Sequence, residues 1–226
     1  QQRTEQRPIV EKLEIAAGVG LCRLPRPSKG DLFLDLEGAR FAREGGREYL
    51  FGAYGAHGAY GTKGQGASAG YREWWAVDDA EEKEAFEAVI DLIMAVWQAG
   101  PGMHVYHFNH YEPNAFKKLM GRYVTRAEQL DRLLRAERFV DLYPIATQAV
   151  RAGVESYSLK KLEQYSGYTR MVELKNVHDS LLKVELALDA NAPALITPEI
   201  CDAVQGYNQD DCRSTEALRD WLESLR

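Results

Sequence analysis

The chain has 226 residues, enough for one large domain or two small ones, and 45% hydrophobic with 27% charged residues is ordinary globular composition. These values exclude a mainly disordered, collagen-like or coiled-coil chain. With 34 acidic against 28 basic side chains the net charge is −6, so the molecule as a whole does not resemble a polybasic nucleic-acid coat or a membrane-surface binder. A local basic groove is compatible with this charge.

Cysteine usage and the absence of targeting segments suggest a compartment. The three cysteines form no CxxC pair, which argues against a disulfide framework and a thiolate zinc site and predicts reduced thiols in the cytoplasm. No apolar run approaches the ~20 residues that cross a bilayer, and QQRTEQRPIV lacks the apolar core of a signal peptide, so no membrane partner is expected. Because the sequence does not begin with Met, we expect the chain to start inside a longer gene product or at a processed end, which leaves room for another domain upstream in the natural protein.

The first 30 residues end in LPRPSKG, where prolines and a glycine indicate a linker or turn. We therefore expect residues 1–30 to be a linker or a partly ordered N-terminal segment, and residues 31–226 to form one domain. The segment DLFLDLEG at 31–38 alternates, with Leu32, Leu34 and Leu36 facing one side and Phe33, Asp35 and Glu37 the other. This pattern predicts a strand with a carboxylate pair on one face.

Two further strands are predicted at 47–55 and 70–77. Between them glycine recurs every third residue from Gly52 to Gly64, but too little proline and too short a run exclude collagen, so we predict a flexible hairpin loop. A helix is expected at 78–99, a buried parallel strand at 103–108 and a helix from Pro113. Helical patterns follow at 125–136, 143–151, 158–165, 179–188 and 198–225, with a short strand at 139–142.

Hairpin strands followed by a βαβ crossover predict an α/β fold with a mixed sheet, in which three antiparallel strands precede parallel ones and helices cover both faces. Asp35 and Glu37 leave the same face of their strand at about 6–7 Å between Cα atoms, so the two like charges need a cation. The alternative without a functional role is a strand whose polar face borders solvent. The apolar surroundings favour a functional role.

Two other segments contribute candidate groups. On the last predicted helix, Tyr207 and Asp211 lie within about 40° of one another, whereas Asp210 points about 100° away and is interpreted as a solvated or capping carboxylate. A tyrosine at this spacing is more often core packing. In HFNHYEPNAFKKL, Asn109 ends a strand and Glu112 precedes a helix, where an acid is either a cap or part of a site at strand ends.

Taken together, these segments resemble the DEDDy branch of the DEDD 3′–5′ exonucleases, which have an RNase H-like fold. Its DxE motif matches Asp35 and Glu37, its Asn-then-acid turn matches Asn109 and Glu112, and its YxxxD motif matches Tyr207 and Asp211. The resemblance covers residues 31 to about 224. FVDLYPI and SYSLKKLEQYSG further resemble uncharacterised RNase H-like domains found beside RecB-like nuclease domains in bacterial proteins.

The resemblance implies hydrolysis of a phosphodiester with two Mg²⁺ or Mn²⁺ ions. It implies that Asp35 bridges both ions, that Glu37 and Asp211 hold the ion that activates water, and that Glu112 supports the other. Tyr207 would orient the attacking water. The family usually has Asp in its second motif, so Glu112 departs from the pattern by one methylene, and Asp141 is a competing candidate that we interpret as a supporting strand-end residue.

Other sites are weakly supported by the sequence. His104 and His107 face opposite sides of a strand, which argues against a zinc triad with His110. No GxxxxGK[ST], GxGxxG or GxSxG motif occurs. Four lysines could contact phosphates beside the acidic centre, although exposed helix lysines are more often solvated: Lys117, Lys118, Lys160 and Lys161.

The leading hypothesis is a metal-dependent 3′–5′ exonuclease acting on single-stranded or frayed 3′ ends of DNA or RNA, with a nuclease or helicase domain in the same natural chain as a further expectation. The alternative is a catalytically inactive nucleic-acid-binding or scaffolding module of a larger DNA-processing protein. A third hypothesis is a mixed-sheet domain whose acids merely line a surface. Convergence of the carboxyl groups of Asp35, Glu37, Glu112 and Asp211 would favour the first hypothesis. A Glu112 that points away, with no replacement by Asp141, would favour the second, and a scattered set of acids would favour the third.

Overall fold

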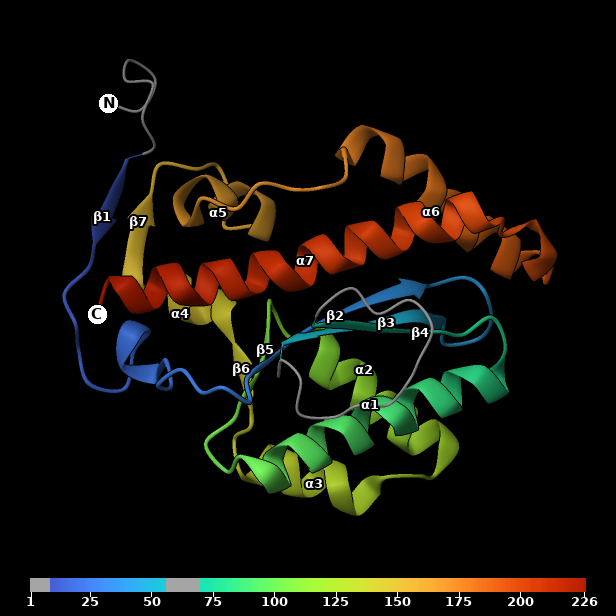
Figure 1. Cartoon of the computed structure of the whole chain (residues 1–226), viewed down its shortest axis with the longest axis horizontal. Helices are drawn as coiled ribbons and strands as arrows, with labels where there is room; N and C mark the ends of the chain where they lie inside the picture. Colours follow the sequence, from blue (N-terminus) through green and yellow to red (C-terminus); the bar gives the residue numbers. More distant parts are fainter. Residues whose placement is uncertain (1–8, 56–69) are drawn as a thin grey trace.

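The computed structural model describes residues 9–55 and 70–226, which form a five-stranded mixed sheet between two layers of helices (Figure 1). The strands are β2 (Leu32–Ala39), β3 (Arg47–Gly55), β4 (Tyr71–Trp75), β5 (Val105–His107) and β6 (Phe139–Asp141). Their order is β4-β3-β2-β5-β6, with antiparallel pairing among β2, β3 and β4 and parallel pairing among β2, β5 and β6. The predicted fold class is confirmed, whereas most of the predicted hairpin loop lies outside the described residues.

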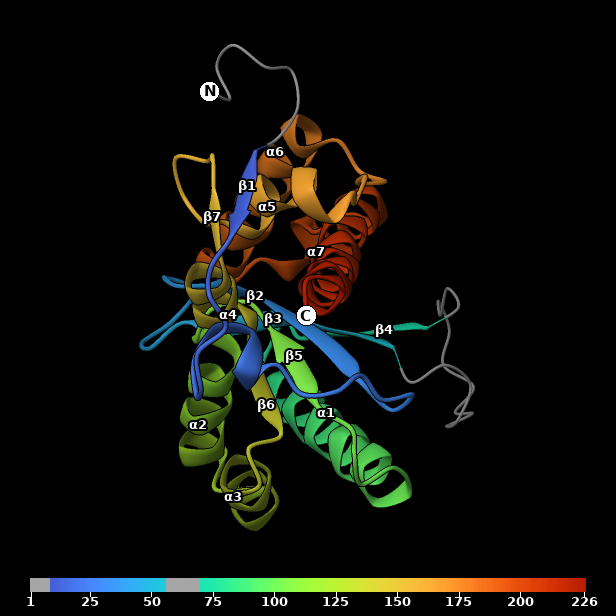
Figure 2. The same ribbon diagram turned by 90° about the vertical axis from the view of Figure 1, so that its left-hand side faces the viewer.

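The helices divide between the two faces of the sheet (Figure 2). One face carries α1 (Asp79–Ala99), α2 (Tyr111–Tyr123) and α3 (Ala127–Arg135). The other carries α4 (Leu142–Ala149), α5 (Leu159–Ser166), α6 (Leu174–Asp189) and α7 (Pro198–Ser224), with a short 3₁₀ helix η2 (Pro193–Leu195) before α7. Helix α2 begins at Tyr111, two residues before the predicted start at Pro113. Proline is tolerated within the first turn because the amides of that turn have no intrahelical partner.

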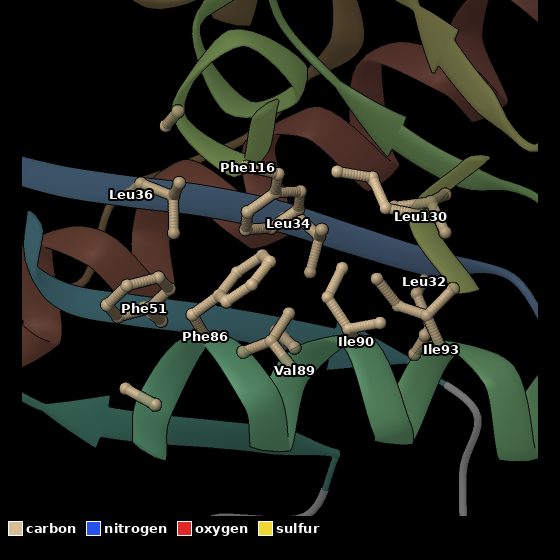
Figure 3. Packing of buried hydrophobic residues seen from close by; sticks show 14 of the residues in the cluster. Leu32, Leu34, Leu36, Phe51, Phe86, Val89, Ile90, Ile93, Phe116 and Leu130 are labelled. Atoms are coloured by element: carbon tan, nitrogen blue, oxygen red, sulfur yellow. The ribbon is translucent and has the colours of Figure 1, made fainter. Parts of the chain in front are cut away.

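The alternation in β2 sorts its side chains as predicted. Leu32, Leu34 and Leu36 are buried against the helices on one side, where they pack with residues such as Phe86, Ile90 and Phe116 (Figure 3). Phe33 is buried in a separate cluster on the opposite side, with Tyr106 and α7. Asp35 and Glu37 share this second face, so α7 lies over the carboxylate pair.

The N-terminal segment contains more structure than a linker. Strand β1 (Val10–Lys12) pairs antiparallel with β7 (Val150–Ala152), and a 3₁₀ helix, η1 (Gly20–Arg23), buries Leu21 and Leu24 beside α4. Elements of three or four residues carry no periodic pattern, which explains why the sequence did not indicate them. The predicted domain boundary near residue 31 remains a prediction, and residues 1–8 lie outside the described part. No helix in the described ranges is both long and apolar enough to cross a membrane.

Candidate metal-binding active site

Strand β2 and helix α7 bring three carboxylates together. One ligand oxygen from each of Asp35, Glu37 and Asp211 lies within 4.8 Å of the other two. Within residues 9–55 and 70–226 this is the only group of three or more His, Cys, Asp or Glu side chains with such spacing. It includes none of the three histidines that the sequence placed near β5, and the three cysteines are free.

A buried asparagine, which the sequence analysis missed, fixes Asp35. Asn208 on α7 donates from Nδ2 to Asp35 Oδ2 at 2.8 Å and to the Asp35 main-chain oxygen at 3.1 Å, and its Oδ1 accepts from the Tyr71 hydroxyl at 2.8 Å. Gly52 is paired with Asp35 across β2 and β3, and a Cβ at Gly52 would overlap Asn208 Oδ1. Glycine opposite the first acid of the strand is therefore what lets α7 reach it.

Burial and neighbouring negative charges raise the proton affinity of Asp35 and Glu37. Burial, followed by the charges of Asp211, Glu37 and Glu112, raises the pKa of Asp35 well above its usual value. Burial and the charge of Asp211 raise the pKa of Glu37 to about 8. Near neutral pH the bare site therefore retains protons, which a divalent cation would displace. An all-oxygen donor set suits a hard cation such as Mg²⁺ or Mn²⁺.

Glu112 lies beside the three acids but outside their 4.8 Å set. Asn109 has φ +76°, a left-handed conformation that asparagine tolerates, and it turns the chain from β5 into α2. Glu112 is 97% buried, and its Oε2 makes no hydrogen bond to the described residues, with His107 Nδ1 3.4 Å away. Burial raises its pKa, an effect that His107 opposes. An unpartnered buried oxygen next to the cluster fits a cation-dependent site.

The competing acid, Asp141, is engaged elsewhere. Its Oδ1 accepts from the main-chain amides of Asn109 at 2.8 Å and Tyr143 at 2.9 Å, so it caps α4 and braces the turn before Glu112. These bonds match the interpretation of Asp141 as a supporting residue. They occupy one oxygen of Asp141, whereas Glu112 Oε2 is buried without a hydrogen bond to the described residues and lies near only His107.

Asp210 was expected to be a solvated or a capping carboxylate, and the first of these alternatives is wrong. This carboxylate is fully buried and accepts from the Tyr168 hydroxyl at 2.7 Å and from the main-chain amides of Met171 and Val172 at 3.0 Å. The segment that it binds, residues 168–172, has no regular structure of its own. The main-chain amides of this segment have no partner in a helix or strand. A buried carboxylate is needed there because it accepts hydrogen bonds from them.

That segment places an arginine against the acidic cluster. Arg170 Nη2 donates to Asp211 and, at 2.6 Å, to Glu163, whose Oε1 also accepts from Ser214 at 2.8 Å. The Arg170 side chain is only 9% exposed, so the guanidinium is a fixed internal cation. Periodicity could not have indicated this residue, because it comes from an irregular segment between two helices.

Tyr207 lies next to Asp211 at the same site. Its hydroxyl accepts from the Lys160 ammonium, and the Arg170 guanidinium lies 5.6 Å from the ring centre. Burial, together with the charges of Asp211 and Glu37, raises the pKa of Tyr207. The phenol therefore stays protonated at neutral pH and can donate a hydrogen bond. The structure places Lys160 on this tyrosine rather than free in solvent.

Asp35, Glu37 and Glu112 line a cleft of about 770 Å³ that is otherwise rich in aromatic side chains. Those side chains are Phe108, Tyr111, Tyr143 and Tyr157. Tyr111 is 39% and Tyr143 is 38% exposed, so both have faces open to a ligand. Aromatic faces in such a place suit planar groups, while the acids suit a cation.

Comparison with known proteins agrees with this geometry. A family model described as the RNase H superfamily matches residues 32–223, from β2 through nearly all of α7. The chain belongs to the RNase H superfamily. No match was found among curated proteins or among solved structures. Membership of the RNase H superfamily and the acidic cluster together fit a nuclease-like domain with a divalent-metal site.

Proposed function

We propose that this chain is a metal-dependent 3′–5′ exonuclease of the DEDDy type that hydrolyses phosphodiester bonds at single-stranded or frayed ends of DNA or RNA. The observation that carries the proposal is the convergence of Asp35, Glu37 and Asp211 within 4.8 Å, with Tyr207 beside them. Asp35 and Glu37 lie two residues apart on β2, and Tyr207 and Asp211 lie four residues apart on α7. The fold brings the two pairs together. Membership of the RNase H superfamily supports the nuclease part.

The residues divide the chemistry among them. Asp35, Glu37 and Asp211 would hold Mg²⁺ or Mn²⁺, and Glu112 would assist with its unpartnered oxygen. When bound, two such ions supply a metal-activated water and neutralise the leaving oxygen. The protonated Tyr207 hydroxyl would donate to the attacking water. Asn208 holds Asp35 in a fixed orientation, which a ligand carboxylate requires.

The aromatic lining of the cleft supports an unpaired strand as substrate. Bases can stack on Phe108, Tyr111 or Tyr143 only when their faces are not already covered by neighbouring bases or a complementary strand. The resemblance to domains found beside RecB-like nucleases supports a further proposal, that the natural protein joins this domain to another nuclease or helicase domain that would deliver such ends.

The test is degradation of 3′-labelled and 5′-labelled oligonucleotides, DNA and RNA separately, in Mn²⁺, Mg²⁺ or EDTA. The wild type is compared with Asp35→Asn and with Asp202→Asn, an exposed acid on the same helix as Asp211. We expect metal-dependent shortening from the 3′ end by the wild type and Asp202→Asn, and none by Asp35→Asn. Cleavage that persists in EDTA or in Asp35→Asn would refute the proposal.

A second candidate is a nucleic-acid-binding module without catalysis. The observation in its favour is the ion pair of Arg170 with Asp211, which already neutralises one of the proposed ligands. In that case the chain would bind oligonucleotides equally in EDTA and in Mn²⁺ and would cleave none of them. Replacement of the usual Asp by Glu112 would then be the first feature to examine.

A further inference from the structure

A second hollow adjoins the acidic cleft. It has a volume of about 420 Å³ and shares Gly38, Arg40 and Tyr111 with the cleft as lining residues. The remainder of its lining comes from the adjoining ends of β2 and β3, the turn between them, and α2. A ligand that fills the cleft and extends past Tyr111 would therefore enter this second hollow.

The boundary between the two hollows is built by specific contacts. Tyr111 donates from its hydroxyl to Glu48 Oε2 at 2.8 Å, which fixes the ring. A Cβ at Gly38 would overlap both the Tyr111 hydroxyl and Glu48 Oε2, so glycine is needed at this point of β2. The strand also shifts register between Glu37 and Gly38, an irregularity that re-aims a strand beside a site.

Basic side chains outnumber acidic ones in the lining of the second hollow, whereas acidic side chains predominate in the cleft. Arg40 is exposed and makes no hydrogen bond or ion pair with the residues that the structure describes. The Lys118 side chain is 43% exposed, and its Nζ is 3.9 Å from Glu48 Oε1, whose partner oxygen is engaged by Tyr111. Arg47, also in the lining, is paired with Asp79 at 2.8 Å. Arg40 is thus an unpaired cation among the described residues, and Lys118, which is half-exposed and has only a 3.9 Å contact with Glu48, is a second cation that a ligand can reach.

We propose that the second hollow binds the backbone phosphates of an unpaired nucleic-acid strand, next to the phosphodiester held in the acidic cleft. This inference rests on the proposed nuclease function and adds the path of the strand. Arg40 and Lys118 are the phosphate-binding residues, and Phe41, 80% exposed beside Arg40, offers a face for base stacking. Both hollows fall in the range of about 300–1,000 Å³ that suits a ligand of nucleotide size.

The two hollows differ in their need for metal. Four carboxylates repel a phosphate unless a cation is bound, whereas Arg40 and Lys118 attract it without one. The strand should therefore bind weakly through the second hollow even in a chelator. This binding should also strengthen at low salt, because phosphate contacts release counterions.

The experiment measures fluorescence anisotropy of a labelled 12-nucleotide single strand, dT or rU, in EDTA at 20–200 mM NaCl with the full chain. The variants are Arg40→Ala, Lys118→Ala and the double variant. Lys117→Ala is the matched control, because Lys117 is an exposed neighbour on α2 that does not line the hollow. We expect the double variant to bind about 10-fold more weakly and its salt slope to fall by roughly 1.4, about 0.7 for each lost phosphate contact. Lys117→Ala should match the wild type.

A kinetic arm with Mn²⁺ separates this inference from the proposed function. A dinucleotide has one phosphodiester and reaches only the cleft, so its cleavage should be unchanged in Lys118→Ala, because Lys118 lines the second hollow and not the cleft, while KM for the 12-mer rises. Equal binding by Lys118→Ala and Lys117→Ala, or an unchanged KM for the 12-mer, would overturn the inference. Salt-dependent binding lost in the double variant, but without cleavage by any form, would support the hollow and refute the nuclease.

Discussion

The two faces of strand β2 meet opposite physical demands. On one face Leu32, Leu34 and Leu36 are at most 6% exposed in a continuous apolar core. On the other, one residue out of step, Asp35 and Glu37 are like charges held together under α7, where burial and repulsion raise the pKa of both. Burial of the leucine face stabilises the fold. The fold holds the two carboxylates together on the other face, and their burial and repulsion lower the free energy of unfolding. Substitutions on the two faces should therefore separate stability from activity.

The largest expected effect is on the acidic face. Asp35→Asn should lower kcat/KM for an oligonucleotide by roughly 10³-fold or more, because metal ions supply several kcal/mol of transition-state stabilisation and each 1.4 kcal/mol is tenfold. Its melting temperature in EDTA should equal or exceed that of the wild type, since a repelling charge is removed. Steady-state kinetics and thermal unfolding check both parts, and a large drop in melting temperature would contradict the second.

Leu34→Ala tests the apolar face. Leu34 is 1% exposed, so we expect about 2–5 kcal/mol lower free energy of unfolding, from lost transfer energy and a residual cavity. Activity per folded molecule should be retained at a temperature well below the melting transition. Urea unfolding and kinetics on the same sample measure the two effects. Loss of activity without loss of stability would show that the faces are not separable.

Gly52→Ala tests the contact between Asn208 on α7 and Asp35 on β2, for which Gly52 on β3 leaves room. The new methyl group would displace Asn208 from Asp35, and loss of such a supporting contact typically lowers metal affinity or activity by about 10–100-fold. Gly102→Ala is the control, because no atom lies within 4 Å of a Cβ built there. If Gly52→Ala bound Mn²⁺ as the wild type does, Asn208 would have no role in orienting Asp35.

Arg170→Met asks whether the internal cation competes with metal for Asp211. Removal of a charged hydrogen bond worth about 1.5–3 kcal/mol should free Asp211 and tighten Mn²⁺ binding roughly tenfold or more. Arg135→Met, an exposed arginine on α3, should leave affinity unchanged. Isothermal titration calorimetry measures the difference. Weaker binding by Arg170→Met would mean that Arg170 positions Asp211 rather than competing for it.

The acidic face also predicts how stability depends on pH without metal. The pKa of Glu37 is about 8 in the folded chain against an ordinary value of 4.5, so between these values the folded state holds more protons than the unfolded state. Stability in EDTA should therefore fall as pH rises through this window. Glu37→Gln should flatten the dependence. Thermal unfolding from pH 5 to 8.5 tests this, and a melting temperature that rises with pH would contradict the raised pKa.

Much of the fold was predictable because its signals are local. Alternation identified β2, and helical spacing identified α1 and α7 nearly to their observed ends. The meeting of Asp35, Glu37 and Asp211 followed from which face of each element they occupy. The family resemblance supplied the order in which those elements had to come together.

The remainder depends on tertiary contacts that no local pattern carries. Arg170 reaches Asp211 from an irregular segment that is held by buried Asp210, a residue for which helical geometry suggested solvent. Asn208 matters because Gly52, more than 150 positions away, leaves room for it. The second hollow depends on Tyr111 packing over Gly38 from a different element.

Equilibrium binding of Mn²⁺, measured by calorimetry or electron paramagnetic resonance at pH 8, tests whether Asp35, Glu37 and Asp211 form a metal site. Wild type, Asp35→Asn and Asp202→Asn are compared without nucleic acid. We expect saturable binding by the wild type and Asp202→Asn that is lost in Asp35→Asn. Equal Mn²⁺ binding by all three proteins, or none by the wild type, would contradict a metal site at Asp35, Glu37 and Asp211.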